Sequence, residues 1–146
     1  MTSHLAKLTG DKVMTAKVLT VRPDTLIEDA ARLMVDNDIG GLPVLEGDRI
    51  VGIVTESDIF KLFIDAFGSR QKGVRVTALV AEKPGTIAAL TSAIAAAGGN
   101  IVSLGTFSGD DPSTGICTLK VSGIPQPRLA EVLGPHVVKV TDVREA

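Results

Sequence analysis

Three oxygen-bearing side chains, Thr55, Ser57 and Asp58, stand where the sequence changes from a strand-like to a helix-like pattern. Such a junction presents unpaired backbone N–H groups and the positive end of a helix dipole, which together favour an anion such as phosphate. Thr55 and Ser57 can donate hydrogen bonds to phosphate oxygens, and Asp58 can accept them from a sugar diol. Thr55 followed three residues later by Asp58 is also a capping-box arrangement, which only starts a helix. Both interpretations remain open at this point.

The elements around this junction are predicted from apolar spacing. Leu42–Leu45 and Ile50–Val54 are two apolar runs separated by a tight turn at 46–48, a pattern typical of a β-hairpin. The helix after Thr55 carries apolar side chains from Ile59 to Phe67 over more than one stripe. This width indicates either core packing or an interface with a partner module, and the interface is favoured because one small unit cannot cover so wide a surface.

Upstream of the hairpin, the sequence predicts a strand within 13–22 that ends at Pro23–Asp24. Thr25, with Glu28 three residues later, predicts a capping box that starts a helix ending at Asn37–Asp38. Leu5 and Leu8 indicate a short helix near the N-terminus.

Composition excludes several classes of function. The 146-residue chain has a formal charge of −2, 3% aromatic residues and neither Trp nor Tyr, so nothing suggests a nucleic-acid surface. Apolar residues make up 45% but occur in short segments, and no signal-peptide pattern is seen. The single cysteine cannot form an internal disulfide, so we expect a cytoplasmic protein without membrane contact.

The second half of the chain has a different pattern. A polar linker at 69–73 separates a first domain, 1–68, from a second, 74–146. The second domain is predicted to contain, in order, a strand at 74–81, a helix at 86–97, strands at 101–107 and 116–121 around a polar loop, a short helix at 128–133 and a strand at 137–143. This βαββαβ order predicts a ferredoxin-like antiparallel sheet with helices on one face, and an α+β fold class for the whole chain.

Residues 13–67 resemble a CBS motif, a short sheet with two helices that normally pairs with a second copy to bind adenine nucleotides. The matching segments are Thr20-Val21-x-Pro23, Gly41-Leu42-Pro43-Val44 and Gly52-Ile53-Val54-Thr55-x-Ser57-Asp58. The resemblance implies that AMP, ADP or ATP is a regulatory ligand and that no cofactor is needed. It also implies a site in which Thr55 and Ser57 contact phosphate, Asp58 holds the ribose, and the adenine slot is lined by Leu19, Ile39, Gly41 and Ile53.

Residues 74–143 resemble an ACT domain, a regulatory fold that often binds amino acids at a dimer interface. The resemblance lies in Glu82-Lys83-Pro84-Gly85 after the first strand and Gly99-Asn100-Ile101 after the first helix. It implies amino-acid-binding residues at Pro84, Gly85, Gly99 and Asn100. The alternative is a purely structural turn in which Asn100 adopts a left-handed conformation.

The CBS-then-ACT order resembles acetoin-utilisation-type regulatory proteins, with the first of their two CBS motifs missing. This implies a homodimer or higher homo-oligomer in which CBS faces CBS and ACT faces ACT. We expect small-molecule effectors and no nucleic acid as partners. The alternatives are an amino-acid-responsive ACT dimer, or a structural association module that binds no nucleotide.

Nothing in the sequence predicts an enzyme or a metal site. Cys117 lies in a predicted strand and His136 follows Gly134–Pro135, and neither belongs to a recognisable catalytic set or metal-ligand spacing. His4 is expected on the surface. Asp110–Asp111 in the polar loop is better explained as solvated charge than as a cation site.

Overall fold

A computed structural model describes residues 18–146. The chain divides into two compact units, 1–59 and 60–146, which are considered separately below. The helix predicted around Leu5 and Leu8, the position of His4 and the start of the first predicted strand lie outside the described residues. No helix in the described part is long and apolar enough to cross a membrane.

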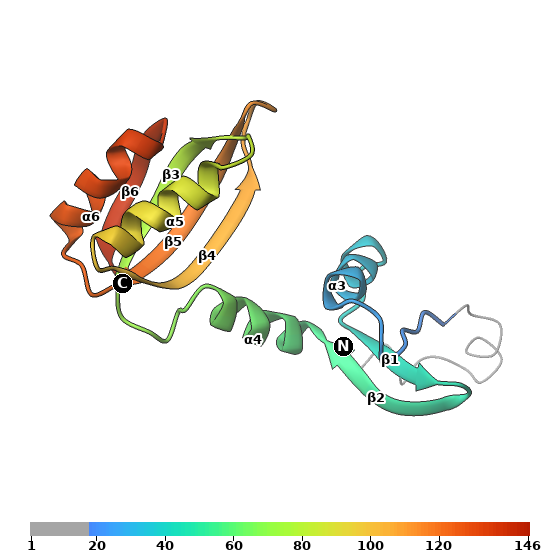
Figure 1. Cartoon of the computed structure of the whole chain (residues 1–146). Helices are drawn as coiled ribbons and strands as arrows, with labels where there is room; N and C mark the ends of the chain where they lie inside the picture. Colours follow the sequence, from blue (N-terminus) through green and yellow to red (C-terminus); the bar gives the residue numbers. More distant parts are fainter. Residues whose placement is uncertain (1–17) are drawn as a thin grey trace. The chain divides into compact units, whose positions relative to one another are not determined.

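The first unit is built on the predicted hairpin, which the structure confirms. Strands β1 (Gly41–Glu46) and β2 (Arg49–Thr55) pair antiparallel, and Gly47 at the turn has a φ of 63° that suits glycine. Helix α3 (Ile27–Asp36) packs on the hairpin (Figure 1). Among the described residues, its core contains Val21, Ala30, Met34 and Leu42.

Two expectations for this unit were wrong. Residues 18–20 are not in a strand, and Val21 makes only an isolated parallel bridge with Val44. Helix α3 begins at Ile27 and has no side-chain cap. The Thr25 hydroxyl instead accepts a hydrogen bond from the backbone N–H of Arg22 at 2.9 Å, so it stabilises the turn after Pro23 rather than the helix.

Helix α4 (Glu56–Ala66) follows β2 directly. Core packing accounts for part of its wide apolar surface, and the interface with a partner module stays a prediction. Ile59 packs against the core of the first unit. Within the second unit, Phe67, just beyond the helix, stacks on Phe107 with ring centroids 5.9 Å apart. Phe60, Leu62 and Phe63 remain exposed.

The second unit has the predicted βαββαβ order. Its elements are β3 (Val74–Ala81), α5 (Thr86–Ala96), β4 (Asn100–Ser108), β5 (Thr114–Ser122), α6 (Gln126–Leu133), the 3₁₀ turn η1 (Gly134–His136) and β6 (Lys139–Glu145). The strand order is β4-β5-β3-β6 and every neighbouring pair is antiparallel. Helices α5 and α6 lie on the same face of the sheet (Figure 1).

The core of this unit lies between the sheet and the two helices. Burial alternates along β3, as expected for a strand with one face in the core. Val76, Leu119, Leu90 and Leu129 are among its fully buried side chains. The opposite face of the sheet carries Arg75, Thr77, Thr118 and Lys120, and it is described further below.

The predicted linker at 69–73 is part of the second unit and is bonded to its sheet. The ammonium group of Lys120 donates to the carbonyl oxygens of Gly68 and Gln71 at 2.9 and 2.8 Å. Gly73 and Ala146 exchange two backbone hydrogen bonds. The division between the compact units therefore falls before this segment, inside α4.

Candidate functional site

The junction between β2 and α4 is organised by Thr55 and Asp58. The backbone N–H and the hydroxyl of Thr55 both donate to Asp58 Oδ2, at 2.8 and 3.0 Å. The Asp58 N–H in turn lies 3.4 Å from Thr55 Oγ1. These reciprocal bonds are those of a capping box, so this interpretation of the junction is confirmed.

Ser57 occupies the remaining polar position at the junction. It is exposed in the first turn of α4, next to an acidic residue on each side, Glu56 and Asp58. The Glu56 N–H is already used by the carbonyl of Gly40 at 3.0 Å. The Ser57 hydroxyl and the positive end of the helix dipole are therefore the groups at this junction that an anion can approach.

The apolar residues expected beside this junction come from three segments. Gly41 pairs with Thr55 across the hairpin, and an added Cβ at Gly41 would lie 3.6 Å from the end of Ile53. Ile53 is 65% exposed, whereas Leu19 and Ile39 are partly buried against the core. The hairpin thus holds Gly41, Ile53 and Thr55 together, with the large apolar side chain of Ile53 open to solvent.

A second candidate region is the loop between β3 and α5. Pro84 and Gly85 border a cavity of about 430 Å³, together with Lys83, Thr86 and His136. Gly85 has a φ of 89° and precedes α5, and Thr86 and Ala89 of the first turn of this helix also line the cavity. A ligand with a carboxylate could therefore meet both Lys83 and the helix start.

Gly99 and Asn100 do not join Pro84 and Gly85 within one chain. They follow α5, whereas the loop precedes it, and an 11-residue helix spans about 16 Å. The left-handed conformation expected at Asn100 is also wrong, because Gly98 has that conformation, with a φ of 84°, and Asn100 begins β4 opposite Ser122. Gly99 is needed for packing, since an added Cβ would lie 2.8 Å from Ile94.

Other chemically active side chains have structural surroundings. Cys117 is fully buried, and this burial raises the pKa of its thiol. His136 lies in η1 beside the β3–α5 cavity. Asp111 accepts hydrogen bonds from the hydroxyl and N–H of Ser113, which lower its pKa. The Asp111 carboxylate therefore stabilises the turn, and no group of metal-binding side chains is found within residues 18–146.

Sequence reasoning missed Arg75 and Lys120, which line a separate cavity on the sheet face opposite the helices. Strand alternation could have placed them on one face, because each lies between core residues in its strand. The pairing of Arg75 with Lys120 and the burial of Lys120 could be seen only in the structure.

Comparison with known proteins identifies the first part of the chain. Residues 10–65 match the CBS domain family, so this segment is a CBS domain. Over 53 residues, 36% of this chain, it is 47% identical to an uncharacterized protein of Methanocaldococcus jannaschii and also 47% identical to a homoserine O-acetyltransferase of Methanohalobium evestigatum. It is 49% identical over 43 residues, 30% of this chain, to an inosine-5'-monophosphate dehydrogenase of Korarchaeum cryptofilum.

The chain corresponds to only part of each of these relatives. The matched segment covers 32% of the first, 11% of the second and 9% of the third. The similarity is therefore to a shared module, and the CBS domain indicates a regulatory, ligand-binding role for it.

Proposed function

We propose that the chain is a ligand-sensing regulatory protein that binds an adenine nucleotide through a pair of CBS domains formed on self-association. The observation that carries the proposal is the CBS match over residues 10–65, which includes the β2–α4 junction with its polar side chains and helix N-terminus. We propose no catalytic step for the chain.

In this proposal the residues at the β2–α4 junction contact the phosphates and the ribose, and their apolar neighbours contact the base. Ser57 and Thr55 contact the phosphates at the start of α4, and Asp58 accepts from the ribose hydroxyls. Leu19, Ile39, Gly41 and Ile53 surround the adenine. Support comes from the hairpin, which brings Gly41 and Ile53 next to Thr55 and leaves Ile53 exposed for a flat apolar ligand or a second CBS domain to cover.

Because Asp58 caps α4, changing it affects the helix as well as any ligand contact. An Asp58→Ala variant loses the bonds to Thr55 as well as any ribose contact, so it weakens the helix start in either case. Ser57→Ala is the cleaner variant, because the exposed Ser57 hydroxyl has no role in the capping box. Asp29→Ala is a matched control, since it removes a first-turn carboxylate from α3, away from the junction.

The test is isothermal titration calorimetry of the full chain with AMP, ADP and ATP. We expect saturable binding of at least one nucleotide, weakened by Ser57→Ala and by Asp58→Ala. A lost hydrogen bond to a charged group is worth about 1.5–3 kcal/mol, or roughly ten- to a hundredfold in affinity. The Asp29→Ala variant should bind like the unmodified chain. Absence of binding for all three nucleotides, or equal affinity in all variants, would contradict the proposal.

A second candidate function is amino-acid sensing by residues 74–146 as an ACT domain. Two observations favour it: the βαββαβ order with the strand arrangement β4-β5-β3-β6, which is that of a ferredoxin-like fold, and the cavity of about 430 Å³ beside Pro84 and Gly85. In this alternative the chain acts as an amino-acid-responsive dimer, in which Gly99 and Asn100 of a second copy complete the site.

Calorimetry with the common amino acids distinguishes this alternative. We expect an amino acid to bind with an affinity that falls when Lys83 is changed to Gln, because Lys83 borders the cavity at the start of α5. Lys72→Gln, in the segment before β3, is the matched control. If neither nucleotides nor amino acids bind, the remaining explanation is a structural association module without a ligand.

A further inference from the structure

The sheet face opposite α5 and α6 has a cavity of its own. It measures about 420 Å³ and lies entirely within residues 60–146. Its lining is formed by Phe63, Phe67, Ser69, Arg75, Phe107, Lys120 and Ala146. It is thus separate from both the β2–α4 junction and the β3–α5 loop.

Basic side chains face one another across this cavity. Arg75 on β3 is directly opposite Lys120 on β5 and directly opposite Arg144 on β6. Like charges on opposite positions of neighbouring strands repel each other. Asp142 is hydrogen-bonded to Arg144 at 2.8 and 2.7 Å, and its charge also acts on Arg75 without forming an ion pair with it. Within residues 18–146, Arg75 and Lys120 therefore face each other with no carboxylate bonded to either.

Lys120 is a charged side chain that is almost completely buried. It is only 3% exposed, and its two hydrogen bonds go to neutral carbonyl groups of Gly68 and Gln71. Neither Lys120 nor Arg75 forms an ion pair with a carboxylate anywhere in residues 18–146. Buried charges in proteins are normally paired with an opposite charge, because an unpaired one is costly to remove from water.

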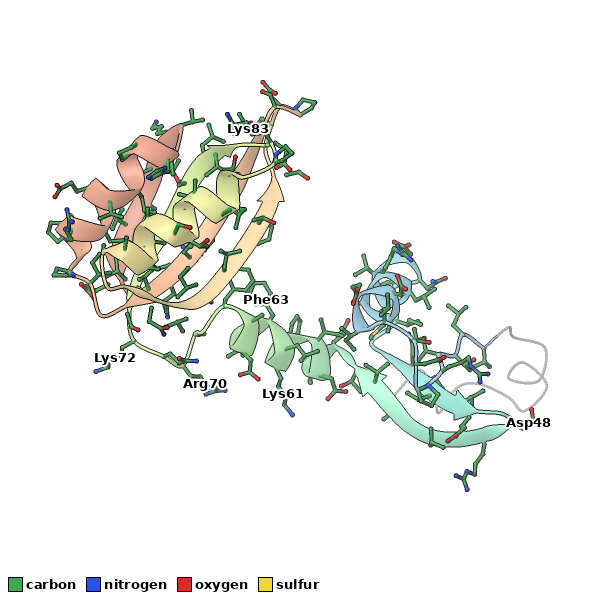
Figure 2. The ribbon with its side chains drawn as sticks, in the orientation of Figure 1. Asp48, Lys61, Phe63, Arg70, Lys72 and Lys83 are labelled. Carbon is green, nitrogen blue, oxygen red and sulfur yellow. The ribbon has the colours of Figure 1, made fainter. Side chains whose placement is uncertain are left out.

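The rest of the cavity is aromatic. Phe63 and Phe67 have ring centroids 4.7 Å apart, and Phe67 stacks on Phe107 at 5.9 Å. Phe63 and Phe107 are 59% and 48% exposed, so their rings are open to a further apolar group. Figure 2 shows Phe63 on the side of α4 that faces the sheet, whereas Lys61 points away from it.

We propose that this cavity is a binding site for a small carboxylate with an aromatic or branched apolar body. The carboxylate lies between Arg75 and Lys120, and its apolar body lies against Phe63, Phe67 and Phe107. Arg offers planar paired donors that match a carboxylate, and the buried ammonium of Lys120 supplies the opposite contact. The site is distinct from those of the proposed nucleotide and amino-acid ligands.

The test uses 3-phenylpropionate as the probe and the full chain labelled with ¹³C on its phenylalanine rings. The chain has four phenylalanines, of which three line the cavity and Phe60 does not, so Phe60 is an internal control. We expect saturable shifts of the Phe63, Phe67 and Phe107 signals. The amine of the same size, 3-phenylpropan-1-amine, should not produce them, and acetate should bind much more weakly.

Three variants show whether the two cations hold the carboxylate. Arg75→Gln and Lys120→Met should each weaken binding of 3-phenylpropionate by about tenfold or more. Lys61→Gln, on the other side of α4, should leave the affinity unchanged. Arg75→Gln is decisive if Lys120→Met fails to fold, because Arg75 does not hold the 68–71 segment.

The proposal is overturned if 3-phenylpropionate causes no shift, if the amine binds equally well, or if Arg75→Gln leaves the affinity unchanged. It is also overturned if the probe does not bind and Arg75→Gln instead changes the sedimentation coefficient. That result would identify the face as an interface between copies of the chain.

Discussion

At the residue scale, Thr55 and Asp58 show how one spacing serves two purposes. Their reciprocal hydrogen bonds start α4, and the same start presents Ser57 and a helix dipole to solvent. A helix cap and a phosphate site use the same backbone geometry, so the sequence alone cannot choose between them. The capping use is observed, and we propose the phosphate site as a second use of the same residues.

Arg144 and Asp142 allow a prediction for pH. The hydrogen bond from Arg144 holds the pKa of Asp142 below its ordinary value of 3.8, with further help from the charges of Arg144 and Arg75. Because the pKa is lowered in the folded state, this pair stabilises the fold above pH 3.8 and ceases to do so as the pH falls through the folded-state pKa. An Arg144→Gln variant should therefore raise the pKa of Asp142 toward 3.8.

The measurement is a carboxyl ¹³C NMR titration of Asp142 in both proteins. Arg128→Gln is the control, because Arg128 pairs with Glu131 on α6 and not with Asp142. An unchanged Asp142 titration in Arg144→Gln would show that the pair does not form in solution.

At the element scale, the hairpin and the βαββαβ order were predictable because they depend on local alternation and turn residues. Strand β3 begins at Val74 and ends at Ala81, as its alternating apolar residues indicate. The start of α3 was not predictable in this way. Thr25 has the residue type and spacing of a cap, but Pro23 and Asp24 form a turn that takes up its hydroxyl, and the helix begins two residues later.

The cap of α4 gives a prediction at this scale. Thr55→Ala removes the hydroxyl that bonds with Asp58 and should destabilise the first turn of α4 by about 0.5–2 kcal/mol. Thr55→Ser, which keeps the hydroxyl, should cost much less. Amide hydrogen exchange of residues 56–59 measures the difference, and equal protection in the two variants would contradict the capping role.

The contact between Phe67 and β4 gives a second prediction. An added Cβ at Gly105 would lie 2.9 Å from the ring of Phe67, so Gly105→Ala should displace the ring and cost about 1–3 kcal/mol in the free energy of unfolding. Gly52→Ala is the matched control, because no atom lies within 4 Å of its added Cβ. Chemical denaturation compares the two variants. If Gly105→Ala is as stable as Gly52→Ala, Phe67 does not pack on β4 in solution.

At the scale of the whole molecule, the sequence did not predict which segments far apart in the chain contact each other. The apolar width of the helix after Thr55 was visible, but not that Phe67 would stack on Phe107, 40 residues further along the chain. The burial of Lys120 depends on the carbonyls of Gly68 and Gln71, which are likewise far from it in sequence. Such contacts follow from topology rather than from any local pattern.

Self-association is the prediction that belongs to this scale. Ile53 of the first unit is 65% exposed, and Phe60 and Leu62 of the second unit are 65% and 49% exposed. Large exposed apolar side chains of this kind mark association surfaces. We expect a dimer or larger assembly at micromolar concentration, weakened by Phe60→Glu but not by Val35→Glu, which changes an exposed apolar residue of α3. Light scattering that returns a 15.1 kDa monomer for the unmodified chain would contradict this expectation.

The central claim is that the β2–α4 junction of the CBS domain holds an adenine nucleotide. The most direct measurement is a ¹⁵N NMR titration of the full chain with AMP, ADP and ATP, which reports every backbone amide at once. The account predicts saturable shifts concentrated at Gly41, Ile53, Thr55 and Ser57. Spectra that do not change with any of the three nucleotides, or changes confined to residues 74–146, would contradict it.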